Sequence, residues 1–243
     1  MNLTTLRSLI FNISFTAWAM LSAILFSPLF FLSSQTSLKV GSPWARISLF
    51  LARLICGIRY EVRGRQHMST SPVIYASKHQ SAWDTIIFLI LLPHPAYVLK
   101  RELLRIHLWG WYLWRMKMIA IDRAAGGQGL KDMLKQAKAR VAEGRSVVIF
   151  PEGTRMPVGA PAHYHPGILA MYNQLKIPVV PVALNSGCFW GRNAFTKRPG
   201  NIVIEFLPPI PPGLPKEEFM TRLQNAIEPA TANLIAEASH KGN

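Results

Sequence analysis

Residues 73–84 of the chain read VIYASKHQSAWD. The first four, Val73 to Ala76, form a short apolar run of the kind that becomes a buried strand, and a polar cluster follows them. A strand that ends in polar side chains and leads into a helix places those side chains at the carboxyl edge of a sheet, where α/β enzymes hold their active sites. The segment therefore predicts an α/β fold with a site near His79 and Asp84.

His79 and Asp84 form a combination suited to proton transfer. If the helix begins near Ser81, the intervening loop lets Asp84 fold back toward His79. An imidazole can then accept a proton from an alcohol, while the carboxylate fixes the imidazole tautomer and stabilises the imidazolium. The alternative is a helix-capping aspartate beside an unrelated histidine.

Other short apolar runs alternate with helical patterns along the chain, and this alternation predicts an α/β domain with a largely buried sheet. The expected strands are Val73 to Ala76, Ala96 to Leu99, Met118 to Ile121, Val147 to Phe150, Val179 to Ala183 and Ile202 to Phe206. We expect one helix to end at Gly144, since glycine is typical of helix C-termini. The last helix should kink or stop at Pro229.

The start of the chain predicts contact with a membrane. The segment Leu9 to Leu32 carries no charge, and as a helix it would be ~36 Å long, enough to cross the ~30 Å hydrocarbon layer of a bilayer. Polar residues such as Asn12 interrupt it, so a helix lying within one leaflet is the alternative. Apolar residues at helical spacing from Trp44 to Ile58 then indicate an amphipathic helix, which either packs on the domain or lies at the lipid interface.

We therefore divide the chain into membrane-associated helices at residues 1–59 and an α/β domain at residues 60–243. Only Arg7 precedes the apolar segment, whereas six basic residues follow it closely: Lys39, Arg46, Arg53, Arg59, Arg63 and Arg65. By the positive-inside rule, this asymmetry places the domain on the cytoplasmic side of the cell membrane.

The net charge of +15 is compatible with an anionic membrane, an anionic substrate or nucleic acid as partner. The basic residues are scattered rather than gathered into an arm, so we expect no nucleic-acid partner. Cys56 and Cys188 are far apart, and no Cys-x-x-Cys motif occurs, so the sequence predicts neither a disulfide framework nor a structural zinc site.

A second polar cluster, FPEGTR at residues 150–155, also follows an apolar strand directly. Gly153 permits a close backbone approach, and the guanidinium of Arg155 offers two parallel donors to a phosphate. Taken alone, the segment is equally compatible with an ordinary turn and a solvated arginine.

Together these segments resemble the glycerolipid acyltransferase family, and specifically the 1-acyl-glycerol-3-phosphate acyltransferases. That family is known for four sequence boxes, and similar segments occur here in order: His79 to Asp84, MIAIDR at 118–123, FPEGTR at 150–155 and VVPVAL at 179–184. The segment VLKREL at 98–103 also looks like the lysine-bearing segment of the family. Two residues depart from the pattern, because Lys78 and Lys117 stand where Asn and Gly are common.

The resemblance implies a mixed sheet and the transfer of a fatty acyl group from a thioester to the sn-2 hydroxyl of 1-acyl-glycerol-3-phosphate. The product would be phosphatidic acid for phospholipid synthesis, and the donor would be acyl-CoA or acyl carrier protein. His79 would be the base and Asp84 its orienter. The residues expected to bind the acceptor are Lys100, Arg123, Glu152, Gly153, Thr154 and Arg155. No cofactor or metal is expected, because a thioester is already an activated donor.

Several alternatives stay open. The acceptor could be another lyso-lipid, such as a lyso-ornithine lipid, or the chain could be a non-catalytic basic protein of the membrane surface. A serine hydrolase has less support, since the sequence lacks a Gly-x-Ser-x-Gly elbow. Lys78 is expected either to lower the pKa of His79 or to point to solvent. The tryptophans at positions 109, 111 and 114 fit core packing, an interfacial belt or an acyl-chain groove.

Overall fold

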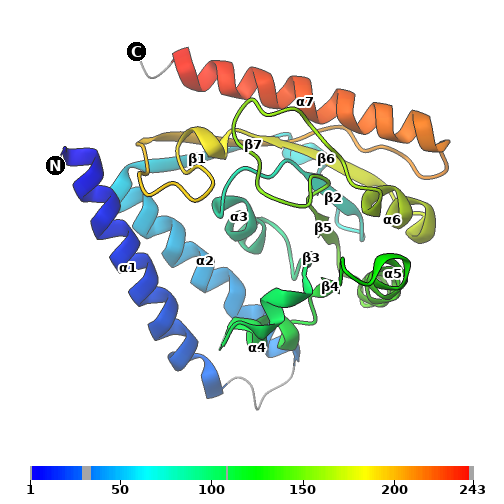
Figure 1. The fold of residues 1–243 in the computed structure, drawn as a ribbon, viewed down its shortest axis with the longest axis horizontal. Coiled ribbons are helices and arrows are strands. Elements are labelled where there is room, and N and C mark those ends of the chain that lie inside the picture. Colours follow the sequence, from blue (N-terminus) through cyan, green and yellow to red (C-terminus); the bar gives the residue numbers. More distant parts are fainter. Residues whose placement is uncertain (1, 29–33, 108, 241–243) are drawn as a thin grey trace.

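The computed structural model describes residues 2–28, 34–107 and 109–240, without the side chains of residues 34–38. Seven strands form one sheet in the order β1-β7-β6-β2-β5-β3-β4 (Figure 1). Strands β6 and β7 are antiparallel, whereas the other neighbouring pairs are parallel, so the sheet is mixed as predicted. The strands are β1 (Ile58–Arg63), β2 (Ile74–Ser77), β3 (Ala96–Lys100), β4 (Ile119–Ile121), β5 (Val147–Ile149), β6 (Val179–Leu184) and β7 (Gly200–Phe206).

Six of these strands were predicted, but β1 was not. The amphipathic helix was expected to continue to Ile58, and instead it ends at Cys56. Gly57 follows in the left-handed conformation, with φ of 70°, which closes the helix and turns the chain into β1. The boundary predicted between residues 59 and 60 therefore falls inside a strand.

Helices cover both faces of the sheet, and successive strand residues point to opposite cores. Tyr75 lies in the core shared with α2 (Ser34–Cys56) and α3 (Trp83–Leu91). Its neighbours Ile74 and Ala76 lie in the core under α5 (Gly126–Ala142), α6 (Gly167–Leu175) and α7 (Lys216–His240). Because both faces are buried, the central strands are apolar throughout, which is why they were recognisable in the sequence.

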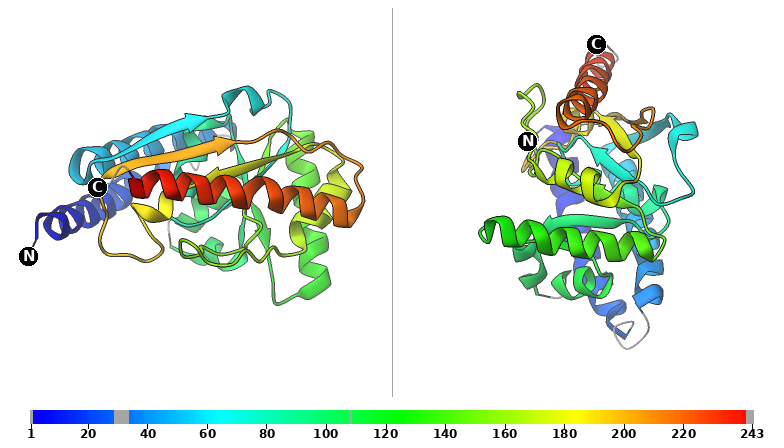
Figure 2. Two further views of the ribbon diagram at one scale, coloured as in Figure 1. Left: turned by 90° about the horizontal axis from the view of Figure 1, so that it is seen from above. Right: turned by 90° about the vertical axis from the view of Figure 1, so that its right-hand side faces the viewer.

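The helix α7 runs along the sheet as one helix (Figure 2). It continues through Pro229, so of the two predicted effects of this residue, a kink or a stop, the stop was wrong. Side chains on both sides of the proline are buried, namely Phe219, Leu223, Ile227, Thr231 and Leu234. This packing outweighs the single backbone hydrogen bond that proline removes. The helix α5 does end as predicted, with Gly144 at φ of 78° just beyond it.

Among the described residues, α1 (Leu3–Leu25) is the one helix long and apolar enough to cross a membrane. The last residues of the predicted segment, 29–32, lie outside the described part of the chain. One face of α1 exposes large apolar side chains, including Leu3, Ile13 and Ile24.

The other face of α1 is attached to the domain through its polar residues. The ammonium of Lys197 donates to Asn12 Oδ1 at 2.7 Å, and the backbone N–H of Lys197 donates to Ser8 Oγ at 2.9 Å. Asn12, which interrupts the apolar segment in the sequence, therefore makes contact with the domain.

Candidate active site

The site begins at the end of β2, where the chain turns into α3. Asp84 lies in the first turn of α3, and its side chain folds back over the loop. Its Oδ2 lies 3.0 Å from His79 Nδ1 and accepts hydrogen bonds from the backbone N–H groups of Gln80 and Ser81 at 2.7 and 2.8 Å. The loop thus holds the carboxylate against the imidazole, in the arrangement that the sequence predicted.

The second oxygen of Asp84 is held by a residue that the sequence analysis missed. The hydroxyl of Ser186 donates to Asp84 Oδ1 at 2.5 Å, and both residues are fully buried. Ser186 follows β6, 102 positions away, so no local pattern connects it to the histidine. The ionised carboxylate can only accept hydrogen bonds, so His79 Nδ1 carries the ring proton and donates a hydrogen bond to Asp84. This leaves His79 Nε2 to accept a proton.

The FPEGTR segment holds His79 from the other side. The ring of Phe150 stacks on the imidazole, with centroids 3.9 Å apart and planes 20° apart. Glu152 Oε2 accepts from the backbone N–H of His79 at 3.0 Å, and the backbone N–H of Met156 donates to the His79 carbonyl at 2.8 Å. Two motifs more than 70 positions apart in the sequence therefore fix one loop.

Glu152, expected to bind the acceptor, lies beneath the loop and is 2% exposed. Its Oε1 is 2.7 Å from the ammonium of Lys78. That ammonium is also 2.8 Å from Oε2 of Glu228 on α7, and the hydroxyl of Tyr164 donates to Glu228 Oε1 at 2.7 Å. Lys78 is therefore buried in an ion pair, and the alternative that it points to solvent was wrong.

The surroundings of Lys78 keep it charged. Burial acts to lower the pKa of the Lys78 ammonium, but the hydrogen bonds and charges of Glu152 and Glu228 outweigh burial, and the pKa is raised. Burial raises the pKa of Glu152, and Lys78 opposes that shift. Lys78 thus neutralises a carboxylate that itself holds the backbone of His79.

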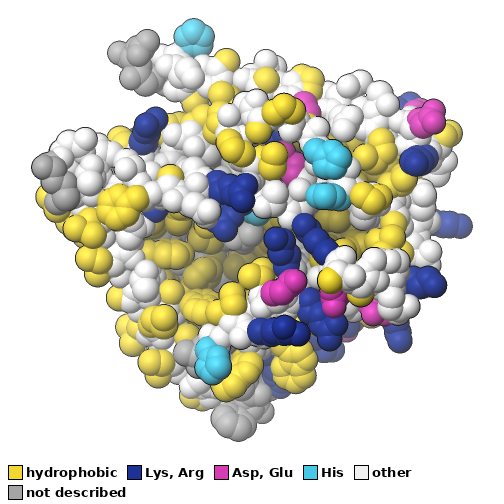
Figure 3. Space-filling model, viewed as in Figure 1, with side chains coloured by type: hydrophobic (Ala, Val, Ile, Leu, Met, Phe, Trp, Pro, Cys, Tyr) yellow, Lys and Arg dark blue, Asp and Glu magenta, His cyan; other side chains and the backbone are white. Residues whose placement is uncertain are grey.

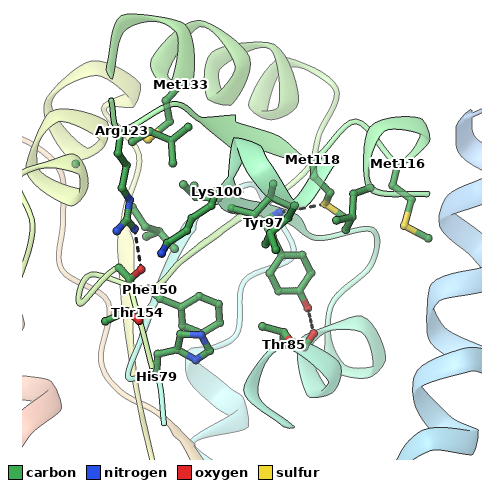
Figure 4. Close-up of a pocket in the computed structure, with 18 of the residues that line it drawn as sticks. His79, Thr85, Tyr97, Lys100, Met116, Met118, Arg123, Met133, Phe150 and Thr154 are labelled. Atoms are coloured by element: carbon green, nitrogen blue, oxygen red, sulfur yellow. Dashed lines mark hydrogen bonds between the residues drawn. The ribbon is translucent and has the colours of Figure 1, made fainter. Parts of the chain in front are cut away.

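A cavity of about 930 Å³ opens beside the histidine. Basic side chains gather along the upper and right-hand rim of the hollow on the face shown in Figure 3. The predicted residues that line it are His79, Lys100, Arg123, Gly153, Thr154 and Arg155. In Figure 4 the charged ends of Lys100 and Arg123 point toward the part of the cavity where His79 and Phe150 stack. The structure thus brings the predicted phosphate-binding cations to the candidate base.

Gly153 is required by both its conformation and its neighbours. It has φ of 65°, which favours glycine, and its carbonyl accepts from Arg123 Nη2 at 2.7 Å. A Cβ at this position would lie 2.6 Å from Arg123 Nη2 and 2.8 Å from Cδ2 of His165. His165 also lines the cavity. Burial lowers the pKa of His165, and Arg123 and His163 lower it further.

The rest of the cavity is apolar and extends toward the N-terminal helices. Its walls include Leu89, Tyr97, Tyr112, Met116, Met118 and Met133. The far end is lined by Phe26, just beyond α1, and by Val40 and Trp44 of α2. A single cavity therefore joins a cationic region beside His79 to an apolar region beside the helices expected to contact lipid.

Residues 59–185 match the profile of the protein family described as Acyltransferase. The chain is 40% identical, over 161 residues, to a 1-acyl-sn-glycerol-3-phosphate acyltransferase of Pseudomonas aeruginosa, and the match covers 66% of this chain and 63% of that protein. It is 30% identical, over 200 residues, to the 1-acyl-sn-glycerol-3-phosphate acyltransferase alpha of Ovis aries, which covers 81% of this chain and 70% of that protein. The chain thus spans less than two thirds of the bacterial relative.

The fold is similar to the crystal structure of the 1-acyl-sn-glycerophosphate (LPA) acyltransferase PlsC from Thermotoga maritima. The TM-score is 0.74 at 20% sequence identity, and the match covers 94% of this chain and 95% of that one. This likeness confirms the predicted fold, including the helices that precede the sheet.

Proposed function

Because the chain belongs to the acyltransferase family, we propose that it transfers a fatty acyl group from a thioester to the sn-2 hydroxyl of 1-acyl-glycerol-3-phosphate. The product is phosphatidic acid, a precursor of phospholipids. The observation that carries the proposal is the cavity itself, which places a histidine–aspartate pair between a cationic region and an apolar region. An acceptor with one phosphate and one acyl chain matches both regions, and the names of the two related proteins support the same acceptor.

In the proposed reaction, His79 Nε2 accepts the proton of the sn-2 hydroxyl as the hydroxyl oxygen attacks the thioester carbonyl carbon. The tetrahedral intermediate collapses, the carbon–sulfur bond breaks, and the imidazolium returns its proton to the departing sulfur. Asp84 holds the tautomer and stabilises the imidazolium through the Nδ1 contact of 3.0 Å. The face of the Phe150 ring gives the transient positive charge further support.

Lys100, Arg123 and Arg155 bind the acceptor phosphate in this proposal. All three line the cavity near His79, and the guanidinium of Arg123 is oriented by the carbonyl of Gly153. The flat guanidinium group suits two-point binding of phosphate oxygens. Glu152 does not face the cavity in this proposal. It lies beneath the His79 loop, where its carboxylate fixes the backbone of His79.

The acyl chains occupy the apolar region, and the donor is acyl-CoA or acyl carrier protein. Either donor presents negative charge to the basic face around the opening. We also propose that α1 lies in one leaflet of the membrane, with the domain on the cytoplasmic side. The polar contacts of Asn12 and Ser8 with Lys197 support the placement of α1 in one leaflet, because they attach α1 to the domain while its apolar face stays exposed.

The test is a comparison of acceptors with detergent-purified protein and both donors. Lysophosphatidic acid should be acylated, whereas a phosphate-free monoacylglycerol should give a much lower kcat/KM. In Arg155→Ala that preference should shrink, mainly through a higher KM for lysophosphatidic acid. Equal kcat/KM for the two acceptors would contradict the phosphate assignment. If only a lyso-ornithine lipid gave product, that lipid would be the acceptor in place of lysophosphatidic acid. Lipid binding without any product would favour a non-catalytic role.

A further inference from the structure

The segment between β3 and β4 exposes an apolar surface, most of which lies outside the cavity. It consists of the short helix η3 (Arg101–Arg105) and α4 (Trp109–Arg115). Trp111 and Trp114 are 57% and 68% exposed, and Leu103 and Ile106 are also exposed. We call these four side chains the α4 patch. The backbone N–H of Gly110 in α4 donates to the carbonyl of Ile106, the residue just after η3, at 2.7 Å.

The inner side of α4 is packed on the two N-terminal helices. The hydroxyl of Tyr112 donates to the Ala23 carbonyl of α1 at 2.7 Å. The ring of Trp109 meets Trp44 of α2 edge to face, with centroids 5.5 Å apart. α4 therefore lies beside the ends of α1 and α2 that adjoin residues 29–33, as Figure 1 shows. This end of α1 exposes Met20, Leu21, Ile24 and Leu25.

The composition of the segment indicates that the α4 patch contacts lipid rather than another protein. Tryptophan is the side chain that best suits the boundary between hydrocarbon and headgroups, because it has an apolar ring and one polar N–H. Four of the five charged residues from 101 to 117 are basic: Arg101, Arg105, Arg115 and Lys117, against Glu102. Exposed tryptophans beside basic side chains match an anionic bilayer surface.

We infer that α4 is a second membrane-contacting element, which inserts Trp111 and Trp114 into the interface of an anionic bilayer. The inference rests on the proposed membrane association of α1 and extends it to a segment distant in sequence. Trp109, Tyr112 and Leu113 of the same helix line the cavity. Insertion of α4 therefore places the apolar end of the cavity beside the bilayer, which supplies the single-chain acceptor and receives the two-chain product.

Fluorescence quenching by lipid tests this directly. A bimane label is placed at Trp114→Cys in a Cys56→Ala, Cys188→Ser background, and the full chain is reconstituted in phosphatidylglycerol vesicles that contain shallow nitroxide-labelled lipids. Labels at Leu21→Cys on α1 and at Ala236→Cys on α7 are the comparisons, since both positions are exposed and α7 lies at the opposite end of the molecule. The label at position 114 should be quenched about as strongly as that at 21 and more than that at 236.

Quenching at 114 no greater than at 236, with 21 quenched, overturns the inference and leaves the membrane contact of α1 intact. A loss of quenching at 21 as well overturns the membrane association on which it rests. A second measurement keeps the native cysteines. In Trp111→Ala/Trp114→Ala, acyl transfer to acceptor embedded in vesicles should fall several-fold, with the rate in detergent unchanged. Equal loss in vesicles and detergent would assign the tryptophans to the fold instead.

Discussion

Replacing Lys78 by methionine should destabilise the protein strongly, although the residue is absent from the cavity lining. The substitution keeps a long apolar side chain and removes only the charge. Glu152 is 2% exposed, and in this variant its carboxylate loses the ion pair with Lys78. It keeps the hydrogen bond from the backbone N–H of His79. An uncompensated buried charge is among the most destabilising features a protein can acquire.

The structure sets the size of this effect. Removing one partner of a buried ion pair typically costs about 3–5 kcal/mol in the free energy of unfolding. The side chains of Lys78 and Glu152 are almost fully buried, so that range applies to their contact. Glu228 is 31% exposed, so its pairing with Lys78 adds about 1 kcal/mol or less. We therefore expect Lys78→Met to lose about 3–5 kcal/mol.

The assay is denaturant unfolding of the detergent-solubilised protein, followed by circular dichroism. Lys78→Met/Glu152→Gln should recover most of the loss, because the second change removes the stranded charge and keeps an acceptor for His79. The matched control is Glu218→Gln, which breaks the exposed pair with Arg222 and should change stability by less than about 0.5 kcal/mol. A Lys78→Met protein within about 1 kcal/mol of wild type would refute the reasoning.

Three further predictions follow from the same geometry. Because the folded pKa of Lys78 is raised, the stability difference between wild type and Lys78→Met should persist from pH 7 up to the unfolded pKa of about 10.4 and shrink as pH rises beyond it. Unfolding measured from pH 7 to 11 checks this, and a difference already lost at neutral pH would contradict it. Gly153→Ala should cost roughly 1–2 kcal/mol and raise KM for lysophosphatidic acid, since the methyl group displaces Arg123, whereas unchanged steady-state kinetics would show that the contact is unimportant. Asp84→Asn should lower kcat roughly 10²–10⁴-fold with little change in KM, because the tautomer of His79 is no longer fixed; an unaltered kcat would remove Asp84 from the mechanism.

Most of the sheet could be predicted because its central strands are buried on both faces and read as continuous apolar runs. The edge strand β1 could not, since Arg59, Glu61 and Arg63 give it a polar pattern and Ile58 falls at helical spacing from Ile55. Only the left-handed Gly57 separates the helix from the strand. Helix α7 shows the opposite case, because tertiary packing overrode the local effect of Pro229.

The site was predictable where its residues are close in sequence. His79 and Asp84 are five positions apart, and the FPEGTR segment is recognisable because it directly follows an apolar strand. The supporting contacts were not predictable, because Ser186 and Glu228 come from elements about 100 and 150 positions away. The burial of Lys78 also had no local signal, since an isolated lysine after a strand is more often solvated.

The most direct test of the account compares phosphatidic acid formation by wild type and His79→Ala in the same detergent, with radiolabelled lysophosphatidic acid and each thioester donor. We predict product from wild type with at least one donor and a loss of roughly 10²-fold or more in the variant, with matching thermal unfolding of the two proteins. Equal rates in the two proteins would contradict the assignment of His79 as the base. No product with either donor would contradict the proposed reaction itself.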